Sequence, residues 1–244
     1  MNVMLSLATS RRIFQQLRRD RRTIAMMILL PALLVILMRF VLNSKQAFEH
    51  SAPSLLVIFP FIVMFLITSV ATLRERTTGT LERLMTMPLG KLDLLLGYAL
   101  AFGLFAVIQV TVVAVLSLTW LGLSIAGSLV LLLVVAVLDA LLGMALGLFV
   151  SAFARTEFQA VQFMPLLAAP QILVCGLFAP RSSMAPPLTW FSNVMPLSYA
   201  VDAMKIVAGS PTVTRDLISD MVVVAGCTLL VLVLGAATLR RRTP

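Results

Sequence analysis

Six long apolar stretches restrict the folds open to this chain more than any other feature of its sequence. A helix needs about 20 mostly apolar residues to cross the hydrocarbon core of a bilayer. Of the 244 residues, 60% are apolar and only 12% are charged, which is unusual for a soluble domain. The sequence therefore predicts an all-α integral membrane protein of one domain, residues 1–244, whose six spans cover about 23–42, 54–73, 94–120, 128–154, 158–179 and 221–239.

The positive charges indicate on which side of the membrane the chain begins and ends. Six spans place both termini on the same side, and fourteen Lys and Arg residues belong to that side against four in the opposite loops. Because Lys and Arg are enriched in cytoplasmic segments, we expect both termini to be cytoplasmic, in a bacterial inner membrane. The formal net charge of +9 then suits anionic lipid headgroups rather than nucleic acid.

The N-terminal segment, residues 1–22, has the pattern of a helix that lies in the membrane interface. Val3, Leu7, Phe14 and Leu17 recur at about helical spacing, with arginines on the other sides. Such arginines reach lipid headgroups while their stems cover apolar surface. We therefore predict an amphipathic interfacial helix on the cytoplasmic side.

The motifs of nucleotide-binding and hydrolytic sites are missing from the sequence. It contains no Gly-x-x-x-x-Gly-Lys-Ser/Thr loop to cradle phosphates, no His-Glu-x-x-His and no Gly-x-Ser-x-Gly. The single histidine, His50, falls in a short outer loop, and Cys175 and Cys227 lie in apolar runs without metal-ligand spacing. We therefore predict no catalytic residue, no metal site and no cofactor bound by this chain.

One polar segment, residues 74–88, separates the second span from the third. Gly79 can cap a helix, with Glu82 reaching back to it as in a capping box, and Pro88 ends the helix. The predicted helix, about 79–87, is too short to be stable alone, so something must pack against it. Its apolar edge, which suits a groove in another protein or the lipid surface, consists of Leu81, Leu84 and Met85.

The same segment matches a family pattern, roughly Glu-Arg-Glu-x-Gly-Thr-x-Glu-x-Leu-x-x-x-Pro, at Glu75, Gly79, Thr80, Glu82, Leu84 and Pro88. It thereby resembles the cytoplasmic coupling segment of ABC-2 type permeases, the membrane subunits of ATP-binding-cassette exporters. A second block, residues 170–204, is similar to the family's fifth span and the short outer helices after it, although Met195 stands where the family often has asparagine. The daunorubicin-resistance type is the subgroup that the chain resembles most.

This resemblance implies a half-transporter with the ABC-2, or type V exporter, fold. Two permease subunits, identical or paralogous, would enclose an outward path for a hydrophobic or amphiphilic drug, antibiotic or lipid. Two separate ATPase subunits would bind ATP and Mg and push on the coupling helix, so this chain would not itself be an enzyme. The residues expected to carry the coupling are Glu75, Gly79, Thr80, Leu81, Glu82, Arg83, Leu84 and Met85.

Four polar side chains inside the predicted spans are candidates for a role in transport. A charged residue at the centre of a span costs about 2.5–3.5 kcal/mol on insertion scales, so Asp139 should face protein or water. Asp139 is either a proton or cation site or a packing residue, with Arg39 as its candidate partner. Gln109 and Gln171 are candidates for hydrogen bonds to a substrate or to a neighbouring helix.

Glycines and prolines predict where the spans approach closely or bend. Gly143 and Gly147 form a Gly-x-x-x-Gly pair, which permits close helix contact within the subunit or between subunits. Pro165 and Pro170 should bend or break the fifth span, as hinges.

Short helices at about 183–209 are predicted in the outer leaflet, between the fifth and sixth spans. One begins at Pro196 and ends at Gly209, with Asp202 and Lys205 available to pair on its polar side. Aromatic residues in this region suit the headgroup layer. The residues expected to define the outer motif are Pro180, Trp190, Pro196, Tyr199 and Asp202.

The sequence leaves two other functions open. A proton-coupled secondary transporter would use Asp139 as its proton carrier, and replacing Asp139 with asparagine would abolish its transport. A membrane assembly protein that transports nothing would show no change in ATP turnover after loss of Gly79 or Glu82.

Overall fold

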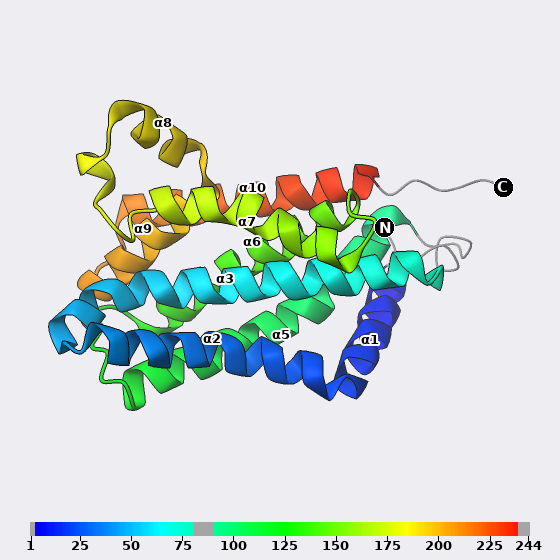
Figure 1. Ribbon diagram of the computed structural model, residues 1–244, viewed down its shortest axis with the longest axis horizontal. Helices are drawn as coiled ribbons and strands as arrows, with labels where there is room; N and C mark the ends of the chain where they lie inside the picture. Colours follow the sequence, from blue (N-terminus) through cyan, green and yellow to red (C-terminus); the bar gives the residue numbers. More distant parts are fainter. Residues whose placement is uncertain (1–2, 81–89, 239–244) are drawn as a thin grey trace.

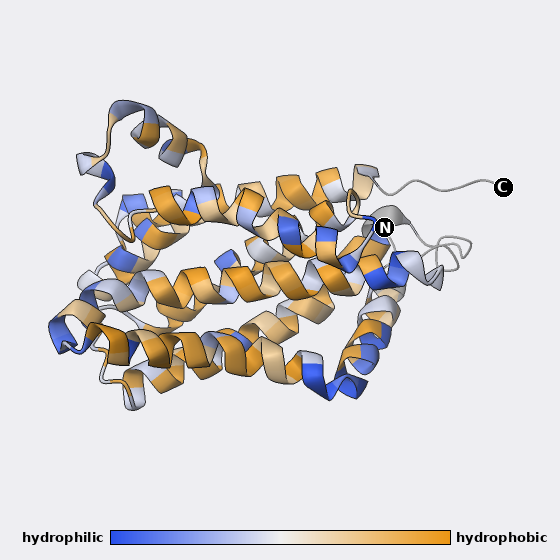
Figure 2. Cartoon of the chain, in the orientation of Figure 1, coloured by the Kyte–Doolittle hydropathy of each residue, from blue (hydrophilic) through white to orange (hydrophobic). Residues whose placement is uncertain are grey.

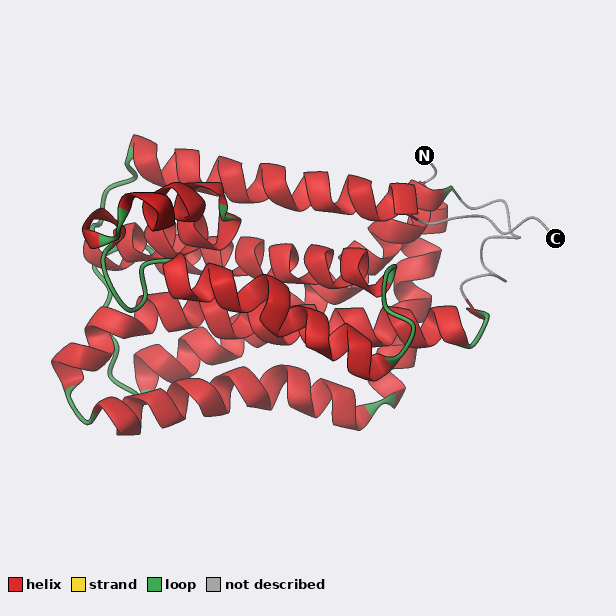
Figure 3. Ribbon diagram, turned by 45° about the horizontal axis from the view of Figure 1, so that its top comes forward, coloured by secondary structure: helices red, strands yellow, loops and turns green. Residues whose placement is uncertain are grey.

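The computed structural model describes residues 3–80 and 90–238, and within these ranges it contains helices and loops but no strand (Figure 3). The predicted all-α fold class is therefore confirmed. In chain order the helices are α1 (Val3–Arg19), α2 (Arg21–Leu42), α3 (Lys45–Thr77), α5 (Lys91–Thr119), α6 (Leu129–Ser151), α7 (Glu157–Val174), η1 (Arg181–Ser183), α8 (Pro186–Val194), α9 (Pro196–Gly209) and α10 (Arg215–Thr238).

Among the described helices, five are long and apolar enough to cross a membrane, namely α2, α3, α5, α6 and α10. They correspond to five of the six predicted spans. The remaining one, 158–179, corresponds to α7, which ends at Val174 and carries three glutamines and two prolines in 18 residues. A crossing by α7 therefore stays a prediction.

Helix α3 extends farther at both ends than the predicted span 54–73. It has 33 residues, which makes it about 50 Å long at 1.5 Å per residue. Ser44 caps its start by accepting the backbone N–H of Ala47. Residues 45–53, predicted as an outer loop, are helical because Phe48 and Ala52 are buried on the same side as the apolar residues that follow.

Helices α3 and α6 lie side by side in the same direction and form the centre of the bundle (Figure 1). A Cβ atom on Gly143 would overlap the backbone carbonyl of Phe61, and one on Gly147 would overlap that of Phe65. The Gly-x-x-x-Gly pair therefore serves contact within this chain, where it lets the backbones of α3 and α6 touch.

Helix α1 packs across the beginning of α5, so it does more than rest on the membrane surface. A Cβ atom on Gly97 of α5 would lie 2.6 Å from the Thr9 side chain, which shows how closely the two helices approach. The predicted apolar face of α1 is wrong in part, because Leu7 is 55% exposed. Small polar side chains fit against Gly97 instead, and among the residues of α1 whose burial is described, the buried ones are Ser6, Thr9, Ile13 and Leu17.

The two ends of the bundle differ in what they carry. Helix α1, the end of α3, the start of α7 and the end of α10 share one end, whereas α8 and α9 lie at the other (Figure 1). Hydrophilic residues are concentrated near these ends, and the helices between them are mostly apolar (Figure 2). This arrangement fits the prediction that both termini lie on one side of the membrane.

Candidate functional site

Two adjacent residues at the C-terminal end of α3 connect this helix to three others. Glu75 accepts hydrogen bonds from Arg12 of α1, with a distance of 3.1 Å from Nη2 to Oε2, and from the hydroxyl of Tyr98 of α5. The Arg12 and Glu75 side chains are only 28% and 16% exposed. This partly buried cluster fixes α1 and α5 to the end of α3.

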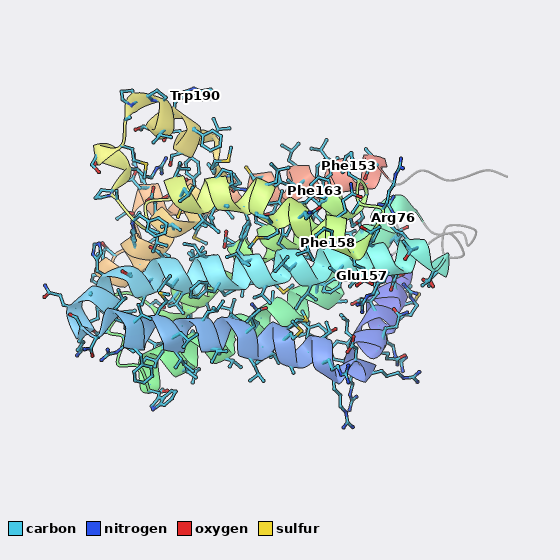
Figure 4. The ribbon with its side chains drawn as sticks, in the orientation of Figure 1. Arg76, Phe153, Glu157, Phe158, Phe163 and Trp190 are labelled. Atoms are coloured by element: carbon cyan, nitrogen blue, oxygen red, sulfur yellow. The ribbon has the colours of Figure 1, made fainter. Side chains whose placement is uncertain are left out.

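The neighbouring residue, Arg74, reaches the start of α7. Its Nε and Nη2 atoms donate to the two carboxylate oxygens of Glu157 at 2.6 and 3.0 Å, a bidentate pair. Both side chains are about half exposed, so the pair contributes at most about 1 kcal/mol to stability. Its geometric effect is larger, since it ties Glu157, the first residue of α7 (labelled in Figure 4), to the last turn of α3. We call Arg74, Glu75 and their partners Arg12, Tyr98 and Glu157 the α3 junction.

The α3 junction lies directly before the predicted coupling helix. Gly79 adopts φ +71°, and its N–H donates to the carbonyl of Arg76, so it is the left-handed residue that ends α3. The helix that Gly79 was predicted to cap lies outside the described residues, so its role as an N-cap stays a prediction. Thr80 lies within hydrogen-bond distance of Thr78, at 3.1 Å between the hydroxyls. The other predicted coupling residues, Leu81, Glu82, Arg83, Leu84 and Met85, lie outside the described residues.

A cavity of about 460 Å³ adjoins the α3 junction, between α1, α2, α3, α5 and α7. Asp20, at the turn from α1 to α2, lies on its rim and caps α2 by accepting the backbone N–H and the hydroxyl of Thr23, at 3.1 and 2.6 Å. The interior is mostly apolar. The lining residues are Ile13, Gln16, Leu17, Asp20, Thr23, Met26, Leu66, Ile67, Val70, Ala71, Arg74, Glu75, Tyr98, Phe102 and Val161.

The polar residues predicted inside the spans do not form one site. Asp139 is fully buried in α6, and among the described residues neither of its carboxylate oxygens has a hydrogen-bond partner. The predicted partnership with Arg39 is not formed, because Arg39 Nε donates to the carbonyl of Leu121 at 3.4 Å. The Arg39 guanidinium also lies 5.7 Å from the ring centre of Phe48, a cation–π contact that holds it near the bundle's end.

The two glutamines bond to backbone carbonyls. Gln109 is buried, and its Nε2 lies 3.5 Å from the carbonyl of Pro60 in α3. Gln171 donates to the carbonyl of Leu167 in its own helix at 3.0 Å. It also lines a second cavity, of about 330 Å³, whose other walls come from α6, α8, α10 and the start of α9. Helix α7 passes Pro165 and Pro170 as one helix, so the predicted break is absent there, whereas a bend stays a prediction.

At the opposite end of the bundle, the outer motif is organised by a residue that the sequence did not single out. Arg181 donates to the carboxylate of Asp202 and to the side chain of Asn193, and its guanidinium lies 5.4 Å from the ring centre of Tyr199. The predicted pairing of Asp202 with Lys205 is wrong, because Lys205 donates to the carbonyl of Gly176 at 2.5 Å. The remaining motif residues serve local structure: Pro180 precedes η1, Pro196 begins α9 and Trp190 is 70% exposed on α8.

Arg12, Tyr98 and Glu157 were also missed as site residues. Each lies 23 or more positions from its partner in the sequence, so no local spacing connects them. A usable signal existed for Glu157, which is an acidic residue at the very start of an apolar segment. Such a carboxylate favours the helix N-terminus and is available to pair with a cation there.

Comparison with known proteins decides the family. The sequence model of the ABC-2 type transporter family matches residues 5–208. This chain belongs to the ABC-2 type transporter family. The match spans α1 through most of α9, so the α3 junction and the cavity both fall within the family's domain.

Individual relatives agree with this assignment. ABC transporter G family member 20 of Dictyostelium discoideum is 29% identical over 163 residues, which cover 67% of this permease and 22% of that protein. The probable multidrug ABC transporter permeases YbhR and YbhS of Escherichia coli are 29% and 25% identical, over 63% and 68% of this permease and 42% and 45% of their own lengths. The permease thus matches less than half the length of these relatives. It is a multi-pass membrane protein.

Proposed function

We propose that this permease is the transport subunit of an ABC exporter, driven by ATP and Mg bound to separate ATPase subunits. The α3 junction is the observation that carries the proposal. Arg74 and Glu75 begin the segment that resembles the family's coupling segment and precede its predicted helix, and they hold the first residue of α7, the middle of α1 and the first turns of α5. A push on residues 79–87 would therefore reach α3 and three further helices at once.

The proposed topology has six crossings, with α7 as the fifth. Both termini and the α3 junction lie in the cytoplasm of a bacterial-type cell, as the excess of Lys and Arg on that side supports. The outer motif around Arg181 then lies in the outer leaflet. Helices α7 and α3 are joined at the cytoplasmic end by Arg74 and Glu157, so a displacement of α3 would also move α7, which contains Pro165 and Pro170.

The proposed assembly contains two permease subunits, identical or paralogous, and two ATPase subunits. Helices α2 and α10 expose rows of large apolar side chains, including Leu29, Leu33 and Phe40 on α2, that lipid or the second permease would cover. The proposed substrate is a hydrophobic or amphiphilic drug, antibiotic or lipid, which the word multidrug in the names of the Escherichia coli relatives supports.

The first test is whether an ABC ATPase co-purifies with the full-length permease. We expect the ATPase to be retained by the natural sequence and reduced at least tenfold when Leu81 and Leu84 are both replaced by aspartate, because two charges would enter an apolar contact. Leu188→Asp, on the exposed side of α8 at the opposite end, is the matched control and should retain the ATPase. Equal retention by all three proteins would refute the coupling role of residues 79–87.

A second candidate function, proton-coupled transport, rests on Asp139 alone. Its complete burial without a described hydrogen-bond partner is what a proton carrier would show, and also what a protonated packing residue would show. For an ABC exporter we expect Asp139→Asn, which keeps the shape of the side chain, to leave ATP-driven transport in proteoliposomes within about twofold of normal. Loss of transport in the folded variant, together with transport driven by a proton gradient without ATP, would favour the second function.

A further inference from the structure

The cavity beside the α3 junction has the form of a lipid-headgroup site. Its volume of about 460 Å³ lies within the range of about 300–1,000 Å³ typical of small-molecule sites. Leu66, Ile67 and Val70 of α3 supply an apolar wall. Met26 of α2 and Val161 of α7, also in the lining, are 59% and 44% exposed, so the cavity opens toward the surrounding membrane between these two helices.

The charged residues that line the cavity differ in whether an oppositely charged side chain pairs with them. Glu75 is paired with Arg12, and Arg74 is paired with Glu157. Asp20 forms no ion pair within the described part of the chain; it accepts hydrogen bonds mainly from Thr23 and is attracted more weakly by the Arg22 backbone N–H and the Arg74 charge. Those bonds, the hydroxyl bond first, hold the pKa of Asp20 below its usual range, so its carboxylate is charged at neutral pH.

Positive charge surrounds this carboxylate on the outside of the cavity. Arg18, Arg19, Arg21 and Arg22 flank Asp20 in the sequence, and all four are exposed. The turn between α1 and α2 therefore presents one carboxylate toward the cavity and a belt of guanidinium groups toward the headgroup layer. Arginine matches phosphate geometry, whereas a carboxylate needs a cation or a hydrogen-bond donor.

We propose that the cavity binds the headgroup of one phospholipid that carries both a phosphate and a primary ammonium group, of the phosphatidylethanolamine class. The ammonium lies at Asp20, to which it donates hydrogen bonds, and the flanking arginines hold the phosphate. The start of the acyl chains lies along the α3 wall and leaves between α2 and α7. The site needs only that the chain is embedded in a membrane, so it does not depend on the proposed transport function.

The headgroup chemistry distinguishes this lipid from other phospholipids. A quaternary ammonium, as in phosphatidylcholine, has no N–H to donate to Asp20, whereas a primary ammonium has three. A phosphatidylglycerol headgroup offers hydroxyl donors but no cation, so its hydrogen bonds to Asp20 lack the contribution of a positive charge. A charge-assisted hydrogen bond is worth about 1.5–3 kcal/mol, which corresponds to a preference for phosphatidylethanolamine of roughly tenfold or more.

The test is native mass spectrometry of the full-length permease, with any ATPase subunit that accompanies it, in micelles containing equal amounts of palmitoyl-oleoyl phosphatidylethanolamine, phosphatidylcholine and phosphatidylglycerol. We expect one phosphatidylethanolamine molecule to be retained per permease, with the preference given above. Asp20→Asn removes the charge but keeps a good helix cap. This variant should retain phosphatidylethanolamine and phosphatidylcholine in nearly equal amounts. Ala71→Trp fills the cavity and should abolish retention.

Controls separate occupancy of the cavity from general lipid binding and from misfolding. Leu33→Trp, on the exposed face of α2, should bind lipid as the natural sequence does. If Ala71→Trp does not yield monodisperse protein, Met26→Trp at the exposed mouth of the cavity replaces it. Equal retention of all three lipids by the natural sequence, an unchanged preference in Asp20→Asn, or full retention in the folded cavity variant would each overturn the proposal.

Discussion

Replacing Gly143 with valine is expected to lower the yield of folded permease at least tenfold. The nearest neighbour of an added Cβ atom is the backbone carbonyl of Phe61, which cannot rotate away as a side chain could. Helices α3 and α6 would have to separate, and overpacking of this kind costs about 1–3 kcal/mol or more. Because each 1.4 kcal/mol is about tenfold in an equilibrium, the loss should be visible as monodisperse protein recovered by gel filtration.

Gly226 provides the matched control for this experiment. It is also a helical glycine, in α10, but no heavy atom lies within 4 Å of the position of its added Cβ. Gly226→Val should therefore be recovered in normal amounts. Equal recovery of the two variants would mean that α3 and α6 do not touch at Gly143.

Replacing Glu75 with alanine should uncouple α1 from the rest of the permease. Arg12 would lose its anion and the buried Tyr98 hydroxyl would lose its acceptor, and each unpartnered group costs about 1–3 kcal/mol. We expect ATP-driven transport in proteoliposomes to fall roughly tenfold or more. Tryptic cleavage after the exposed Arg18 and Arg19 of α1 should become faster by a similar factor, since α1 is released from α5.

A surface carboxylate tests whether this effect is specific to the α3 junction. Glu49→Ala removes the partner of Lys45, whose side chain is 67% exposed, and the acceptor of the exposed Ser124 hydroxyl. Such an exposed pair contributes about 0–1 kcal/mol, and both partners stay open to water, at the opposite end of α3 from Glu75. The transport and cleavage rates of Glu49→Ala should stay close to normal. A double-mutant cycle that adds Arg12→Gln should also show coupling between Arg12 and Glu75. Additive effects of the two substitutions would contradict the proposed role of Glu75.

The helices were predictable from the sequence where hydrophobicity alone decides them. Helices α2, α5 and α6 begin and end within a few residues of the predicted spans, because lipid demands unbroken apolar runs. The start of α3 at Lys45 was missed, since burial by other helices rather than lipid stabilises its first turns. The length of α7 was overestimated, because its last apolar residues belong to the turn before η1.

The candidate site was less predictable, because its contacts join residues that lie far apart in the sequence. Glu75 was identified from its place in the coupling segment, but its partner Arg12 was one of six N-terminal arginines that charge counting cannot tell apart. Likewise, the Gly-x-x-x-Gly motif predicted close packing without indicating the partner helix. The expected pairing of Asp202 with Lys205 was wrong because Asp202 accepts from Arg181 instead. The Arg181 guanidinium donates to Asn193 as well, and spacing along one helix cannot reveal such a partner from another segment.

The length of α3 has a mechanical consequence. At about 50 Å, this single helix is longer than the hydrocarbon core of about 30 Å, so both of its ends project beyond the core. Gly143 and Gly147 of α6 contact α3 at Phe61 and Phe65, close to its midpoint and directly after Pro60, so this contact is the point around which α3 can tilt. A tilt of about 10° around that fulcrum would move each end by roughly 4 Å, in opposite directions. A displacement of Glu75 at one face of the membrane would then move Lys45, at the other face, in the opposite direction.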